Sequence, residues 1–162
     1  MTIRAALLVS DAAQLDSDGR LYLLGAGVQV MPTPTPPHAL VVRLLLDAAD
    51  ALVPHQVRVG LLDSTGGPVL VPGAPSAATG PAGLPGMVTT QPLQLGQDLP
   101  ALAGDLADLP DWGPVSLPLL FNLGPGLPVR SGPHRWQVTV DGTVVDEAVV
   151  LFLDPQTEGA QA

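Results

Sequence analysis

Short apolar runs, each ended by a turn, constrain the fold of this chain more than any other feature. Its 19 prolines and 18 glycines interrupt almost every apolar stretch. Runs this short suit β-strands, because helices need longer periodic segments. Disorder is not expected in spite of the proline and glycine, since 46% of the residues are hydrophobic and the mean hydropathy is positive.

The period of two that marks a half-buried strand recurs along the chain. It is found in residues 40–46, 55–63, 115–121 and 136–140. Pro118 lies inside one of these runs and predicts an edge strand, because proline cannot donate to a ladder. The strongest signal is Asp141-Gly142, which stands between two apolar runs and predicts a tight hairpin ending in a strand over residues 143–153.

The first third of the chain contains a second hairpin signal. Residues 3–10 form an apolar run, and Asp16-Ser17-Asp18-Gly19 has residue types that tolerate left-handed backbone angles. A hairpin turn is therefore predicted there, with the returning strand at residues 21–24. The prolines of residues 32–37 predict a stiff, extended connection.

The middle of the chain has weaker periodicity. Residues 72–92 predict a loop that is longer than ordinary connections. In residues 99–109 leucines recur at steps of three and four residues, which predicts one short amphipathic helix bounded by Pro100 and Pro110.

Together these elements predict an all-β fold, a two-layer antiparallel β-sandwich of immunoglobulin-like or related type with at most one short helix. Residues 1–154 are expected to form a single domain, with residues 72–113 as an insertion of loop and helix. Residues 155–162 are expected to be a flexible tail.

Charge limits the classes of partner. The formal net charge is −9, with six arginines, no lysine and no cysteine. A surface of this sign repels nucleic acid and anionic lipid. No apolar run approaches the ~18 residues of a membrane span, and the apolar run at the start is too short for a secretory signal. We expect a cytoplasmic protein with no membrane insertion and no cofactor.

Two segments resemble a known family. Residues 10–14 (Ser-Asp-Ala-Ala-Gln), residues 19–27 (Gly-Arg-Leu-Tyr-Leu-Leu-Gly-Ala-Gly) and the closing Val138-Thr139-Val140-Asp141-Gly142 are similar to a family of small bacterial proteins known only as a domain of unknown function. The resemblance implies a β-rich fold and implies no activity.

Metal ligands are sparse. Asp16 and Asp18 resemble the start of a calcium loop, but the twelfth position of such a loop would be Gly27 instead of a glutamate, so a plain hairpin turn is the preferred interpretation. His38, His55 and His134 lack the spacing of a zinc site and are interpreted as scattered surface histidines. No metal is predicted.

No catalytic constellation is evident either. Ser10 and Asp11 could join His38 or His134 as a nucleophilic triad, but the chain has no Gly-x-Ser-x-Gly elbow. The leading hypothesis is a non-enzymatic binding or assembly module that contacts a protein partner, or a second copy of itself, through loops and an edge strand.

The candidate binding residues lie in two places. Asp105 and Asp108 belong to an acidic stripe beside the predicted helix, and the interaction surface is expected on residues 72–113. The alternative is a small-ligand or carbohydrate-binding sandwich, possibly hydrolytic, that uses Asp11, Tyr22 and Trp112. A pocket that gathers those three residues would favour this alternative.

Glu147 conflicts with the predicted hairpin. A two-residue turn at Asp141-Gly142 would place Glu147 opposite Trp136, on the face expected to be buried. A β-bulge that shifts the register, an open sheet edge, or a functional acid would each resolve the conflict. The bulge is the most economical of the three.

Overall fold

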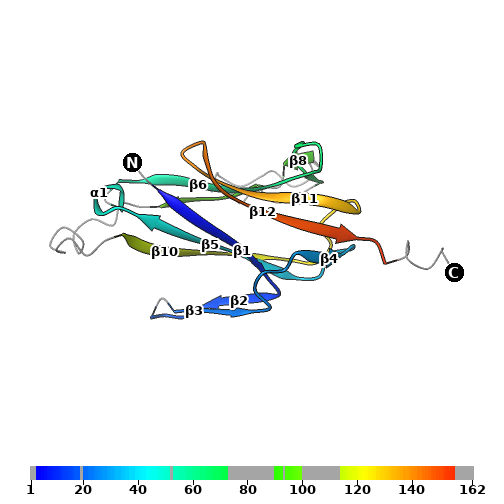
Figure 1. Cartoon of the computed structure of the whole chain (residues 1–162), viewed down its shortest axis with the longest axis horizontal. Coiled ribbons are helices and arrows are strands. Elements are labelled where there is room, and N and C mark those ends of the chain that lie inside the picture. The colour runs from blue at the N-terminus through cyan, green and yellow to red at the C-terminus, as the bar shows by residue number, and fades with distance from the viewer. Residues whose placement is uncertain are drawn as a thin grey trace, which may run out of the picture.

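The computed structural model describes residues 3–18, 20–51, 53–72, 90–92, 94–99 and 114–155 (Figure 1). The chain is mostly β with one short helix, α1 (Ala48–Ala51), which confirms the β-rich part of the prediction. The strands are β1 (Arg4–Ser10), β2 (Ala12–Leu15), β3 (Leu21–Leu24), β4 (Val30–Pro32), β5 (His38–Leu46), β6 (His55–Leu62), β7 (Leu70–Pro72), β8 (Thr90–Pro92), β9 (Gln94–Leu99), β10 (Val115–Leu123), β11 (Gly132–Val140) and β12 (Thr143–Leu153). No helix in these residues is long and apolar enough to cross a membrane.

One sheet has three strands in the order β1-β5-β10, all antiparallel. Alternate residues of the central strand β5, from Leu40 to Leu46, are buried as predicted. Among the described residues β10 pairs only with β5, so Pro118 lies in an edge strand, also as predicted. On the side of β10 that faces away from β5, no described strand could accept an N–H, so the missing N–H of Pro118 costs no ladder bond there.

The larger sheet has five strands in the order β4-β12-β11-β6-β9. Strands β11 and β12 form the predicted hairpin, and its turn residues Asp141 and Gly142 have φ angles of 50° and 81°. Positive φ at both central residues matches the right-handed twist of the flanking strands, which explains why Asp-Gly is favoured here.

The two sheets share one hydrophobic core. Apolar side chains from both sheets form a single buried cluster. Its members with no more than 1% exposure include Leu40, Val42, Leu44, Val57, Val59, Trp136, Val138, Val150 and Phe152. The β2–β3 hairpin lies outside the two sheets (Figure 1), and its turn is formed at Asp16 as predicted. The Asp16 carboxylate accepts the backbone N–H groups of Asp18 and Arg20 at 2.9 and 2.7 Å.

The prediction of one long loop over residues 72–92 was wrong at the ends that the structure describes. Strand β9, which no periodicity predicted, pairs with β6 along six residues and ends at Leu99. The helix found in the described residues is α1, and the segment between Pro100 and Pro110, where a helix was predicted, is not among them. Thr90–Pro92, expected in a loop, is a strand paired with β7. The rest of the predicted helix and loop, and the tail beyond residue 155, lie outside the described residues.

Candidate functional site

A β-bulge in the β11–β12 hairpin determines where the acids of β12 lie. The register shifts between Val138 and Thr139, so Glu147 pairs with Gln137 and Trp136 pairs with Ala148. This confirms the bulge that the sequence favoured. Glu147 is exposed and accepts a hydrogen bond from Gln137 Nε2 at 2.7 Å.

The Glu147 carboxylate contacts two side chains on the same face of the sheet. The Gln137 hydrogen bond and the Arg135 guanidinium, 3.2 Å away, keep the pKa of Glu147 below its usual value. It is a solvated surface acid and not the buried functional acid that an unshifted register would have created.

The same bulge brings Asp146 to the other sheet. Asp146 pairs with Val138, whose side chain points into the core. Its Oδ2 accepts the backbone N–H of Leu7 in β1 at 2.6 Å. Since β1 pairs with β5 on its other side, this carboxylate caps a donor at the free edge of the three-stranded sheet.

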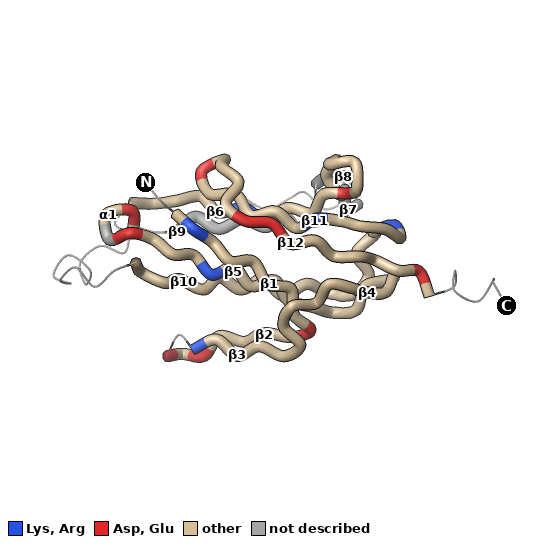
Figure 2. The backbone as a smooth tube through the Cα atoms, in the orientation of Figure 1, with Lys and Arg blue, Asp and Glu red and all other residues tan. Residues whose placement is uncertain are grey.

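Next to this contact a groove of about 630 Å³ separates β1 from β12. It is lined by residues 7–9 of β1, the connection 27–30, and Glu147, Ala148, Val149 and Leu151 of β12. The volume is within the usual range of ligand sites, roughly 300–1,000 Å³. Figure 2 shows two adjacent acids in β12 followed by a stretch of the same strand without charge.

The groove exposes large apolar side chains. Val149 is 61% exposed, Val30 54% and Leu8 38%. These residues come from three separate segments of the chain, so the apolar surface exists only in the folded protein. Exposed apolar residues that line one groove mark interaction sites more often than isolated exposed residues do.

The connection into β4 crosses between β1 and β12. Gly27 and Val28 both donate their N–H groups to Val9 O, at 2.8 and 3.0 Å, while Leu151 N–H donates to Gln29 O at 2.8 Å. The connection therefore bonds to both strands. The positive φ of Gly27, 87°, makes its tight approach to β1 accessible.

Between Asp146 and Leu151 the edge of β12 is open. Leu151 and Leu153 direct their backbone polar groups toward β4, so Val149 and Glu147, two and four residues before Leu151, direct theirs to the same side. No described residue pairs with those groups. The groove thus combines apolar side chains with an unpaired strand edge.

All three histidines are buried, with 3 to 6% exposure, so the prediction of surface histidines was wrong. Each begins or lies within a strand whose alternate residues face the core, and its ring is carried inward with them. Among the described residues, no group of three or more His, Asp or Glu side chains could hold a metal ion.

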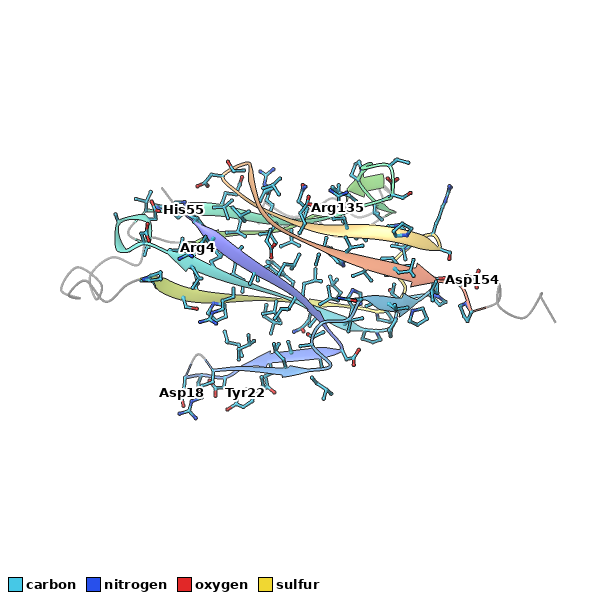
Figure 3. All side chains as sticks on the ribbon, in the orientation of Figure 1. Arg4, Asp18, Tyr22, His55, Arg135 and Asp154 are labelled. Atoms are coloured by element: carbon cyan, nitrogen blue, oxygen red, sulfur yellow. The ribbon has the colours of Figure 1, made fainter. Side chains whose placement is uncertain are left out.

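His55 (Figure 3) forms a clamp at the end of the larger sheet. Its Nδ1 lies 2.7 Å from Asp141 Oδ2, and its Nε2 lies 2.9 Å from Asp50 O. Burial lowers the pKa of His55, but these two acceptors outweigh burial and raise it. Because both ring nitrogens face acceptors, the protonated form of the ring is favoured, and neither nitrogen is open to a substrate.

The other two histidines contact core aromatics. His38 Nδ1 lies 2.9 Å from Pro36 O, and its ring centroid is 6.4 Å from that of Trp136. Burial lowers the pKa of His38, which keeps the ring neutral. His134 packs edge-on against Phe152 with centroids 5.0 Å apart. Both rings are packing elements of the core.

The residues predicted to bind a ligand are not brought together where the structure describes them. Asp11 lies at the base of the β2–β3 hairpin, where its N–H bonds to Leu24 O. Tyr22 (Figure 3) is 55% exposed, and its hydroxyl lies 3.3 Å from Asp16 near the tip. Asp105, Asp108 and Trp112 lie outside the described residues.

One feature of the sequence could have indicated the groove. Residues 148–153, Ala-Val-Val-Leu-Phe-Leu, form an unbroken apolar run, which is typical of a strand buried on both faces. The His55–Asp141 contact joins residues 86 positions apart and has no local signal.

Comparisons with known proteins give no relative for this arrangement. A scan against protein-family models, a search of curated proteins and a search of solved structures each found no match. The resemblance to a bacterial family of unknown function stays a prediction.

Proposed function

We propose that this chain is a non-enzymatic binding or assembly module built on a two-layer antiparallel β-sandwich, which takes a protein partner at the open edge of β12. The observation that carries the proposal is the groove between β1 and β12. There, exposed apolar side chains flank backbone groups of Glu147 and Val149 that have no described partner.

The shared core supports the sandwich architecture. Side chains from the three-stranded and five-stranded sheets fill one cluster, as expected when each sheet covers the other's apolar face. With the inner faces committed to packing, binding is left to edges, connections and outer faces.

Strand addition is a common way to recognise a protein segment. The partner's backbone completes the ladder, and side-chain pockets select its residues. β4 already adds to β12 in this manner at Leu151–Leu153, so an incoming segment would occupy the vacant positions immediately before it.

The histidine geometry favours binding over catalysis. His55 and Asp141 form the closest His–carboxylate pair in the described residues, but Asp50 O already occupies the second ring nitrogen. A general base needs a free nitrogen within reach of its substrate.

The test is affinity capture from an extract of the source organism, with wild-type protein and two matched variants. Val149→Asp places a charge in the groove, whereas Thr139→Asp places one on the outer face of β11. A partner that is retained by Thr139→Asp and lost with Val149→Asp supports the proposal. A partner that binds both variants equally contradicts it, provided that both have wild-type melting temperatures.

A further inference from the structure

The two strand edges that border the groove differ in how they are protected. On the β1 side, Leu7 N–H is capped by Asp146, and Val9 O accepts two N–H groups from the connection 27–28. On the β12 side, the backbone groups of Glu147 and Val149 have no described partner. An incoming extended segment therefore meets an open edge on β12 and an edge on β1 that is closed at Leu7 by a carboxylate.

Asp146 occupies the place that a strand would use. In a β-ladder the Leu7 N–H would be paired with a carbonyl oxygen of the neighbouring strand, and Asp146 Oδ2 supplies an oxygen in its stead at 2.6 Å. Carboxylates that point inward at a sheet edge are known to prevent unwanted pairing. The bulge is what makes this possible, because it aligns Asp146 with the inward-facing Val138.

Removal of this cap has an electrostatic consequence. Asp146 is half-buried, so a segment that took over the Leu7 N–H would leave its carboxylate without a partner in a poorly solvated place. Glu147 follows directly, and the chain carries a net charge of −9. A cationic side chain on the segment would compensate the displaced carboxylate.

From this geometry, and resting on the function proposed above, we propose that the partner of the groove is an extended protein segment in which a lysine or arginine stands beside apolar residues. The segment pairs with β12 at Glu147 and Val149, its apolar residues contact Leu8, Val30 and Val149, and its cation draws Asp146 away from Leu7. Asp146 thus acts as a latch that selects for positive charge.

The experiment uses the whole chain and three capped synthetic peptides at physiological salt. The first alternates valine and lysine, the second alternates valine and glutamate, and the third is the lysine peptide with an N-methylated backbone. Binding is followed by amide chemical shifts and hydrogen exchange. We expect the lysine peptide to shift the amides of Leu7, Glu147 and Val149 and to bind at least about ten-fold more tightly than the glutamate or N-methylated peptide.

Two charge-neutralising variants sharpen the test. Asp146→Asn keeps an oxygen for Leu7 N–H but removes the charge, and should weaken the lysine peptide about ten-fold. Asp18→Asn removes an exposed acid at the β2–β3 turn and should leave the affinity unchanged. Equal binding of lysine and glutamate peptides, no binding of either, equal effects of the two variants, or shifts that avoid the groove would each overturn the inference.

Failure here is distinguishable from failure of the proposed function. If affinity capture still depends on Val149 while charge reversal has no effect, the binding module stands and the latch is wrong. If capture is also insensitive to Val149→Asp, both are wrong.

Discussion

Strands β11 and β12 are the two halves of one hairpin, yet they present opposite chemistry to solvent. Both bury alternate residues in the core, such as Trp136 of β11 and Phe152 of β12, each with 0% exposure. Three of the outward residues of β11 are polar, namely Arg135, Gln137 and Thr139, and the fourth is Pro133 at the start of the strand. Those of β12 after Glu147 are apolar, with Val149 61% exposed, beside Val150 at 0%.

This difference shows that the outer face of β11 is suited to contact with water and that of β12 is not. A polar outer face needs no cover, and β11 also has β6 and β12 on its two sides. After Glu147, β12 combines an apolar outer face with an edge that, within the described part of the chain, β4 covers only at Leu151–Leu153. A partner at the groove would cover both features of β12 at once.

The largest effect expected from this comparison is on stability. Phe152→Ala should lower the free energy of unfolding by about 3–5 kcal/mol, because it leaves a cavity in the shared core. Val150→Ala should cost about 2 kcal/mol, whereas Val149→Ala, the same change one residue away, should stay within about 0.5 kcal/mol. Urea unfolding measures all three. Equal costs for the two valines would show that Val149 is structural, and the comparison would fail.

The sequence predicted these strands far better than it predicted the site. Alternation and the Asp141-Gly142 turn were enough to locate β11, and the conflict at Glu147 was enough to favour a bulge. β9 and the groove depend on which strands become neighbours in space, and no local pattern encodes that. The acids expected to bind, Asp105 and Asp108, lie outside the described residues, whereas Asp146 became visible only through its contact with Leu7.

A smaller effect concerns the turn that joins the two strands. Hydrogen bonds from Gln56 N–H and His55 lower the pKa of Asp141, while Asp141 and Asp50 O raise that of His55 against its burial. Because its pKa is raised, His55 contributes stability that is fully present below about pH 6.5 and is lost as pH rises through its pKa in the folded protein. Because its pKa is lowered, Asp141 contributes stability above about pH 4, and this contribution is lost as pH falls through its pKa in the folded protein.

Asp141→Asn should therefore lower stability most between about pH 4 and pH 6.5. The expected loss is about 1 kcal/mol, since the Asp141 side chain is 42% exposed and solvent screens the pair. Asparagine tolerates positive φ, so the turn itself is retained. Melting temperatures of both proteins across this range give the difference, and a difference independent of pH would contradict the charged clamp.

The smallest effect belongs to the polar contacts between the two strands. Glu147→Gln removes an exposed ion pair with Arg135 and should leave the unfolding midpoint nearly unchanged at low salt, with an even smaller change at high salt. Chemical denaturation at two ionic strengths measures it. A large drop in the unfolding midpoint would mean that Glu147 holds the bulge in place.

If the partner binds at the open edge of β12, hydrogen exchange of the captured complex reports it at the amides of that edge. The amides of Glu147 and Val149 should exchange more slowly in the complex than in the free protein, because a new strand would accept their hydrogens. Unchanged exchange at these two amides, with protection confined to the exposed β2–β3 hairpin around Tyr22 and Leu24, would contradict the account.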